Sequence, residues 1–288
     1  EKGVLLLMSD RRNPGTLVQF PHLFSDSSYH QRWIPQVKDP LVRRFWVREF
    51  PQTNYRNDNY LHYVVSKFYP FISHPLMRNV IGQRKCSLDF HQIMNDGKIL
   101  LVNLAKGKLG ELNSSLLGMI VMARLWVAAL RRINLPVPRR RDFYLYVDEF
   151  QNLATDTFRR GLSEGRKFGL NMTICHQYMT QLTREVAGSI LGNVGTLVAF
   201  RVGLPDAEAL AGYFEPAVSK HALAHQPDHH AYVRLMTDGQ FSPPFSMWTR
   251  LEPAANDGAE RARRIRGDSQ RRYGKKRETV EKEIARDL

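Results

Sequence analysis

Residues 143–149, Phe-Tyr-Leu-Tyr-Val-Asp-Glu, give the clearest indication of the fold. Five apolar or aromatic residues in a row, entered from a Pro-rich and basic turn, are typical of a strand buried on both faces of a parallel sheet. The carboxylates of Asp148 and Glu149 would then lie at the carboxyl edge of that sheet. Ligands bind at this edge in open α/β folds, so the pair becomes the first candidate site.

Before and after residues 143–147, patterns typical of strands alternate with patterns typical of helices. The apolar runs predict further strands, and the segments with a 3.6-residue period predict helices. The predicted strands are 97–104, 143–147, 171–175 and 196–202; the predicted helices are 112–133, 156–167, 180–186, 206–214 and 217–224; and an antiparallel pair, 231–235 with 245–250, follows. Four alternations predict βαβ units that build a parallel sheet flanked by helices, an α/β fold.

Two regions differ in composition from this core. Aromatic and charged residues at helical spacing predict an inserted helical subdomain over residues 20–82. Between Arg261 and Arg277, nine basic residues face one acid, so residues 253–288 are predicted to be a basic tail that is disordered or only transiently helical. We therefore expect residues 1–19 to end the N-terminal part of the core and residues 83–252 to form its second part.

Charge and hydropathy limit the partners. The 288 residues contain 42 Lys and Arg against 28 Asp and Glu, a net charge of +14, which favours nucleic acid or an anionic membrane surface as a neighbour. No run approaches the roughly 20 apolar residues of a membrane span, so this stretch of chain is predicted to be soluble. Because the chain opens at Glu1 without an initiator Met, we expect it to be a piece of a longer protein.

The Asp-Glu pair has a specific chemical interpretation. In nucleotide hydrolysis, Asp148 would hold the Mg²⁺ shell and Glu149 would orient and deprotonate the attacking water, because phosphoryl transfer needs charge neutralisation and an aligned nucleophile. The alternative is an acidic N-cap of the segment that follows.

Two more side chains are candidates for the same chemistry. Gln177 follows the predicted strand 171–175, where its amide could hold the lytic water or sense the γ-phosphate; it could also be a helix cap. Arg166 closes the helix between the two strands, either complementing the helix dipole or reaching the nucleotide of a neighbouring subunit. The phosphate-binding pattern Gly-x-x-x-x-Gly-Lys-Ser/Thr does not occur in the 288 residues.

A family resemblance joins these motifs. Residues 144–152, Tyr-Leu-Tyr-Val-Asp-Glu-Phe-Gln-Asn, are followed by Leu-Ser-Glu-Gly-Arg-Lys-Phe-Gly-Leu at 162–170 and His-Gln-Tyr-Met-Thr-Gln-Leu at 176–182. With Asp-Pro-Leu-Val-Arg-Arg-Phe-Trp at 39–46 and the run 97–111, this order resembles the type IV secretion-system coupling proteins of the TraD/TraG kind, relatives of the HerA and FtsK hexameric DNA translocases.

The resemblance implies a RecA-like P-loop ATPase core that binds ATP and Mg²⁺ between the subunits of a hexamer, with DNA in the central pore. By position, Asp148 and Glu149 match the Walker B pair, Gln177 the strand-end Gln and Arg166 the arginine offered to the adjacent subunit. Arg201 is a lesser nucleotide-binding candidate. The nucleic-acid candidates are the basic run Arg139, Arg140 and Arg141.

The resemblance also bears on partners and location. It implies a relaxase and secretion-channel proteins as further partners, and a cytoplasmic location, either free or at the inner membrane through a segment outside this chain. The Walker A loop is the part of the family pattern that is absent.

Three functions follow as hypotheses. The first is an ATP-driven DNA translocase that moves basic residues along the phosphate backbone without reading sequence. The second is a non-hydrolysing adaptor that holds DNA or an acidic partner. The third gives the basic tail a role at a membrane surface, although the tail lacks the apolar stripe of an interfacial helix.

Overall fold

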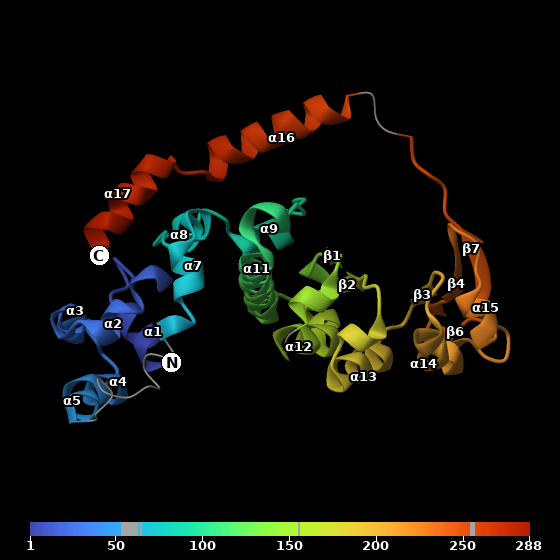
Figure 1. Cartoon of the computed structure of the whole chain (residues 1–288), viewed down its shortest axis with the longest axis horizontal. Helices are drawn as coiled ribbons and strands as arrows, with labels where there is room; N and C mark the ends of the chain where they lie inside the picture. The colour runs from blue at the N-terminus through green and yellow to red at the C-terminus, as the bar shows by residue number, and fades with distance from the viewer. Residues whose placement is uncertain (53–62, 64, 155, 254–256) are drawn as a thin grey trace. The chain divides into compact units, whose positions relative to one another are not determined.

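The computed structural model describes residues 1–52, 63, 65–154, 156–253 and 257–288. The chain forms two compact units, and Figure 1 shows their helices and strands coloured along the sequence. The first combines Glu1–Asp89, Asn103–Ser114 and Glu260–Leu288, and the second combines Phe90–Val102 and Ser115–Ala259. Among the described residues, no helix is both long and apolar enough to cross a membrane.

The first unit is built from helices. Its elements are α1 (Lys2–Leu7), η1 (Leu17–Gln19), α2 (His22–Ser25), α3 (Ser27–Gln31), η2 (Ile34–Gln36), α4 (Pro40–Arg44), the π-helical turn η3 (Phe45–Glu49), α5 (Phe50–Gln52), α7 (Tyr69–Ser73), α8 (Pro75–Ile81), α10 (Lys106–Leu109), α16 (Gly258–Tyr273) and α17 (Arg277–Asp287). Local sequence starts them: the Asp39 carboxylate accepts the backbone N–H groups of Leu41 and Val42, and Pro40 occupies the first turn of α4.

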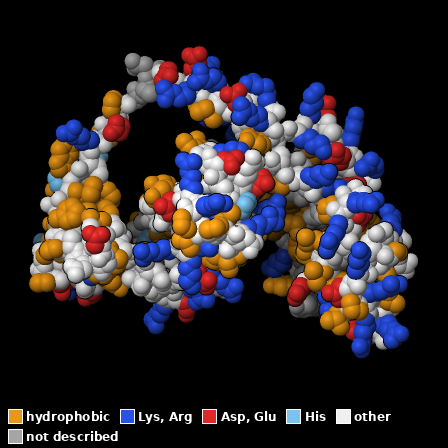
Figure 2. All heavy atoms as spheres, turned by 180° about the vertical axis from the view of Figure 1, so that it is seen from behind, with side chains coloured by type: hydrophobic (Ala, Val, Ile, Leu, Met, Phe, Trp, Pro, Cys, Tyr) orange, Lys and Arg blue, Asp and Glu red, His pale blue; other side chains and the backbone are white. Residues whose placement is uncertain are grey.

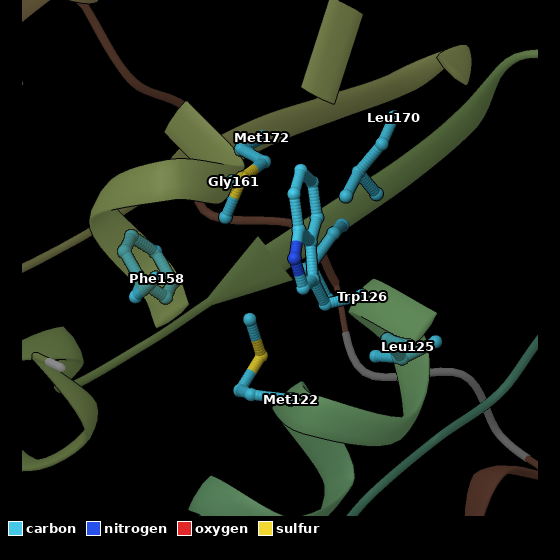
Figure 3. A pocket seen from close by; sticks show the side chains of 8 residues that line it. Met122, Leu125, Trp126, Phe158, Gly161, Leu170 and Met172 are labelled. Carbon is cyan, nitrogen blue, oxygen red and sulfur yellow. The ribbon is translucent and has the colours of Figure 1, made fainter. Parts of the chain in front are cut away.

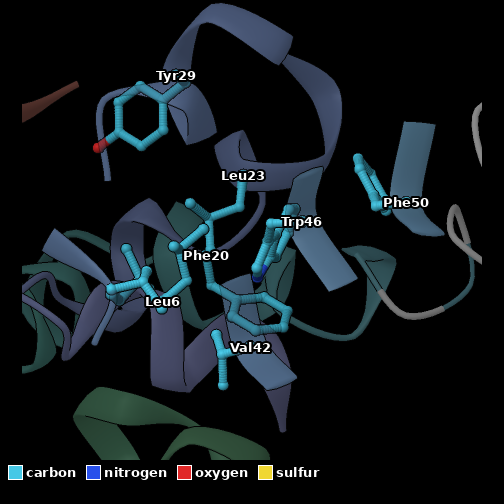
Figure 4. Close-up of a cluster of buried hydrophobic side chains, with 9 residues drawn as sticks. Leu6, Phe20, Leu23, Tyr29, Val42, Trp46 and Phe50 are labelled. Atoms are coloured by element: carbon cyan, nitrogen blue, oxygen red, sulfur yellow. The ribbon is translucent and has the colours of Figure 1, made fainter. Parts of the chain in front are cut away.

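An aromatic core holds the N-terminal helices of this unit together (Figure 4). Trp46 is 1% exposed, and its ring lies 4.8 Å from that of Phe50 and 5.5 Å from that of Phe24, centroid to centroid. The indole N–H of Trp46 donates to the Lys2 carbonyl at 3.2 Å, which ties α1 to η3. The described part of the region predicted to be a helical subdomain is therefore helical, and it shares its core with α1.

Residues 258–287, predicted to be disordered or only transiently helical, form the helices α16 and α17. Val280 and Ile284 are spaced i, i+4 on one face of α17, and both are buried against Val18, Ile72 and Ile81. Helix α16, which has no buried residue, dominates the composition of the tail. The mean hydropathy over the whole tail therefore hides the apolar pair Val280 and Ile284.

The second unit holds all the strands of the described chain. Its elements are α9 (Phe90–Asn95), most of α11 (Glu111–Arg131), η5 (Arg132–Asn134), η6 (Val137–Arg139), β1 (Phe143–Val147), η7 (Phe150–Leu153), α12 (Asp156–Glu164), η8 (Gly165–Phe168), β2 (Leu170–Ile174), η9 (Met179–Gln181), α13 (Arg184–Asn193), β3 (Leu197–Ala199), α14 (Leu204–Phe214), α15 (Lys220–Ala224), β4 (His230–Arg234), β5 (Met236–Thr237), β6 (Gln240–Phe241) and β7 (Phe245–Trp248).

Strands β1 and β2 pair in parallel, with register from Phe143 opposite Leu170 to Val147 opposite Ile174. Helices α11 and α12 pack against this pair through Met122, Leu125, Trp126 and Phe158, which surround a residual cavity of about 10 Å³ (Figure 3). That space is about the size of one water molecule and is lined by apolar side chains, so it is a packing gap and not a ligand site.

The remaining strands depart from the predicted parallel sheet. Strand β3 pairs antiparallel with β4, and β4 pairs antiparallel with β7, whereas β5 and β6 form a separate hairpin. Helices α14 and α15 connect β3 to β4, and β4 runs beside β3 in the opposite direction. Phe214 and Leu223 are fully buried in the hydrophobic core that these helices form with β3. The predicted antiparallel pair is confirmed as β4 and β7. Strand β3 pairs with β4 and not, as predicted, with the parallel strands.

The predicted strand at 97–104 is wrong. Residues 99–105 have no regular structure, and Ile99 and Leu101 are 89% and 77% exposed. A continuous apolar run predicts a strand only because a sheet would cover both its faces, and no strand among the described residues pairs with this segment.

Candidate functional site

Asp148 and Glu149 lie where β1 ends, at the carboxyl edge of the parallel pair. Asp148 is exposed, and its Oδ1 accepts the backbone N–H of Glu149 at 2.9 Å. Glu149 has a left-handed backbone, φ 50° and ψ 43°, which is unusual for a residue with a side chain. Such strain is often found at functional sites, and here it turns the chain sharply after the strand.

Two amides hold the Glu149 carboxylate. Gln177 Nε2 donates to Oε1 at 2.7 Å, and Gln151 Nε2 donates to Oε2 at 2.6 Å. Gln177 follows β2, so the structure brings it together with Asp148 and Glu149 as the sequence predicts. The sequence reasoning missed Gln151; its position two residues after Glu149, in a tight turn, is the signal that could have found it.

The backbone around the site continues the β1–β2 pairing beyond the strand ends. The Cys175 N–H donates to the Val147 carbonyl at 2.9 Å, and the Phe150 N–H donates to the Cys175 carbonyl at 3.0 Å. Phe150 is fully buried, and its ring lies 4.3 Å from that of Phe158, centroid to centroid. These contacts fix the backbone on both sides of Glu149, so its carboxylate is positioned without a ligand.

His176 lies beside Gln177 on the loop after β2. Its Nε2 is 3.2 Å from Met179 Sδ, and burial lowers the pKa of the imidazole while Asp206 partly opposes that effect. Asp206 is 5% exposed and accepts the Met179 N–H at 3.3 Å. The neutral ring and the buried carboxylate thus support the loop that carries Gln177.

The predicted basic residues lie elsewhere. Arg166 is exposed in η8, immediately before β2, and therefore at the opposite end of that strand from Gln177. Arg201 donates to Asp228 Oδ1 at 2.8 Å and to the Gln226 carbonyl at 3.3 Å. Within this chain, the structure brings neither arginine to the Glu149 carboxylate.

Part of the basic run before β1 makes contacts within the second unit. Arg140 donates to the carbonyls of Leu135, at 2.9 Å, and of Lys167. The guanidinium of Arg141 lies close to Gly97, where an added Cβ would be 2.2 Å from its Cζ. Arg139 closes η6 and is exposed. These arginines precede β1, and Asp148 follows it.

The donor set at the carboxyl edge suits Mg²⁺. Magnesium in nucleotide sites takes one or two carboxylates, with water and phosphate oxygens as its other ligands. Asp148 offers one exposed carboxylate, of which Oδ1 has a backbone partner. In the described part of the chain, no group of three or more His, Cys, Asp or Glu could enclose a metal ion without such outside ligands.

Comparisons with known proteins bear on the same region. A family model described as "TraM recognition site of TraD and TraG" matches residues 142–221, which include the whole candidate edge. A search of curated proteins returns no match.

Solved structures of one kind of protein match the fold. The plasmid coupling protein TrwB in complex with ADP and Mg²⁺ matches with a TM-score of 0.58 at 16% identity, over 88% of this chain and 64% of that chain. The bacterial conjugative coupling protein TrwBdeltaN70, in its unbound monoclinic form, matches at 0.59 and 15%, with the same coverage. TrwB with the non-hydrolysable ATP analogue ADPNP matches at 0.55 and 15%.

The chain spans less than two thirds of the length of these coupling proteins. The match confirms the predicted α/β fold of the RecA-like class, with helices added to it. In its fold, and in the family segment 142–221, the chain is similar to the type IV coupling proteins of the TraD and TraG kind.

Proposed function

We propose that this chain is part of an ATP-driven DNA translocase, the coupling protein of a type IV secretion system used in conjugation. The observation that carries the proposal is the Glu149 carboxylate, held between the amides of Gln151 and Gln177 beside the exposed carboxylate of Asp148. The matching TrwB structures are complexes with ADP and Mg²⁺ or with an ATP analogue, which supports ATP and Mg²⁺ as the ligands.

Each side chain at the edge has a role in this proposal. Asp148 would hold Mg²⁺ through its shell, and the ion would neutralise the charge on the transferred phosphoryl group. Glu149 would accept a proton from the attacking water, because its carboxylate is fixed at the strand end by two donors. Gln177 bonds to Glu149 directly and would hold the water or the base in line.

The basic residues away from the edge fit an assembly of several subunits. Arg166 is exposed at the opposite end of β2, so its role would be to reach the nucleotide of a neighbouring subunit in a ring, which we propose to be a hexamer. Arg201 remains a lesser nucleotide candidate, and Arg139 and Arg141 remain candidates for DNA contacts. Arg140 is the weakest of the three, because its guanidinium already serves backbone carbonyls.

A protein partner is also part of the proposal. The family description names a TraM recognition site, so residues 142–221 are proposed to contact a relaxosome protein of that kind. A relaxase and the secretion channel would be further partners. The location would be cytoplasmic, free or at the inner membrane.

The experiment is an ATPase assay of the complete protein that contains this chain, with Glu149→Gln compared to Glu164→Gln. Both changes remove one carboxylate, and Glu164 is exposed in α12 away from the edge. Loss of a general base should lower kcat by about 100-fold or more, whereas the control keeps wild-type turnover. DNA-stimulated hydrolysis retained in Glu149→Gln would contradict the motor and favour the non-hydrolysing adaptor.

A further inference from the structure

A second candidate site lies wholly within the helical unit, in a cavity of about 460 Å³. Four segments line it: the turn after α1, the loop after α8, the end of α16 with its connection to α17, and α17 itself. This volume is in the range of small-molecule sites. Asp148 and Glu149 belong to the other unit, so the cavity is no part of the site described above.

The walls of the cavity are fixed by contacts across the unit. Ser87 Oγ donates to the Tyr273 carbonyl at 2.6 Å, which joins the loop after α8 to the end of α16. Arg84 binds Asp287 through two hydrogen bonds, the longer being 2.7 Å from Nε to Oδ2. The Asp287 carbonyl accepts the Tyr29 hydroxyl at 2.8 Å, so α17 is held at its end as well as along its apolar face.

The charge of the lining is strongly positive. Six Lys or Arg side chains line the cavity against two carboxylates, Glu283 and Asp287. Both carboxylates are engaged: Asp287 by Arg84, and Glu283 by Lys275 at 2.5 Å. Across the described chain, Arg12, Lys85 and Arg272 have no ion-pair partner, and all three are exposed.

This arrangement has the chemistry of a phosphate site with a neighbouring base. Guanidinium and ammonium groups from three separate segments can surround one phosphate, with Arg contributing paired donors. Tyr273 also lines the cavity, is 37% exposed, and supplies an aromatic surface of the kind on which bases stack. A cation cluster alone would fit any anion, whereas the added aromatic ring favours a nucleotide.

We propose that this cavity binds a nucleotide unit, with its phosphate on Arg12, Lys85 and Arg272 and its base on Tyr273. The unit would come from a free mononucleotide or from a single strand. Helix α16 carries further exposed arginines away from the cavity, Arg263, Arg264 and Arg266, so a strand that leaves the cavity would meet more positive charge. Figure 2 shows Lys and Arg side chains along the helix that follows the grey segment 254–256.

The test measures binding of a fluorescein-labelled 12-nucleotide strand to the whole chain by anisotropy, over a range of salt concentrations. The triple variant Arg12→Gln, Lys85→Gln, Arg272→Gln should bind about tenfold more weakly or worse, and its salt slope should fall by about 2. The matched control Arg263→Gln, Arg264→Gln, Arg266→Gln removes the same charge from α16 outside the cavity and should change affinity less. Tyr273→Leu should weaken binding about fivefold or more.

A second arm identifies the source of the nucleotide. Displacement of the labelled strand by AMP, lost in the cavity triple, would assign the cavity to free nucleotides as well as strands; no displacement by AMP, with the strand effect retained, would assign it to strands alone. Equal weakening by the two triples would overturn the proposal in favour of general electrostatic attraction. Cavity variants within twofold of wild type would overturn it also, whatever the Glu149→Gln assay gives.

Discussion

Arg132 shows how one buried charge can organise the base of the parallel pair. It is fully buried at the start of η5, and its guanidinium donates to Asn95 Oδ1 at 3.0 Å and to the Phe168 carbonyl at 2.9 Å. Burial lowers the pKa of Arg132, and the nearby Asp142 opposes that effect. The side chain therefore binds the end of η8 at the point where β2 begins.

We expect Arg132→Met to lower the free energy of unfolding by about 2–4 kcal/mol, because the Phe168 carbonyl and the Asn95 amide would lose their buried partner. The measurement is urea unfolding followed by circular dichroism. Arg131→Met, at the exposed neighbouring position, is the control and should stay within about 0.5 kcal/mol of wild type. Equal stability of the two variants would contradict the structural role of Arg132.

A pH effect follows from His176. Because burial lowers the pKa of the folded imidazole below its ordinary value of 6.5, the unfolded chain takes up the proton first as the pH falls. The contribution of the neutral ring to the stability of the fold is therefore complete above pH 6.5 and is lost as the pH falls below 6.5. Tm measured between pH 7.5 and 5.5 should fall less in His176→Gln than in wild type, and parallel curves would rule the effect out.

Only part of the arrangement at the candidate site could be predicted from the sequence. Asp148, Glu149 and Gln177 follow apolar runs, and the parallel pairing of two such runs is enough to place strand-end side chains together. Gln151 and the left-handed backbone of Glu149 depend on how one turn closes, which hydrophobic periodicity does not report. The position of Arg166 relative to a partner subunit is likewise a property of an assembly.

Among the elements, those with a local signal were predicted best. Strand β1 has the predicted bounds, since a basic, Pro-containing turn precedes it and carboxylates end it. The segment 97–104 carries an equally apolar run and forms no strand, because pairing is decided by neighbours and not by the run itself. Helix α17 is the opposite case: its local composition is polar, yet it packs through two buried residues one turn apart and through hydrogen bonds of Asp287.

Ile284→Asp tests the docking of α17. A charged group in the site of a buried Ile side chain should detach the helix and cost about 3 kcal/mol of stability. Trypsin should then cleave the exposed Lys275–Arg277 connection at least about tenfold faster, since its backbone opens locally once α17 is no longer docked. Ala285→Asp places the same charge on the exposed face and should leave the rate unchanged. A resistant Ile284→Asp protein would show that α17 does not need its apolar face.

Gly82 explains how α17 comes so close to the helix beside it. A Cβ at this position would lie 2.7 Å from Ile284 Cδ1 and 2.6 Å from the Arg78 carbonyl, so a larger residue would collide with both. The glycine ends α8 and leaves space for the Ile side chain. The docking of α17 thus depends on a small residue about 200 positions earlier in the chain.

For the whole molecule, the two units separate two kinds of chemistry. The family segment 142–221 and the carboxylate edge lie in the second unit, whereas the positively charged cavity lies in the first. The hydrolysis proposed at Glu149 and the nucleotide binding proposed at the cavity therefore depend on different cores. The fold shared with the coupling proteins covers 88% of the chain, so it extends over both units.

The docking of α17 also orders events during synthesis. Gln19 and Asp287 are hydrogen-bonded across 268 residues of sequence, and Tyr29 and Asp287 across 258. The second unit is nearly continuous, so its strands and helices can assemble while the ribosome is still translating. The helical unit contains residues on both sides of the second unit in the sequence. Until Val280 and Ile284 are made, Val18, Ile72 and Ile81 present an uncovered apolar surface to the nascent chain and to any chaperone nearby.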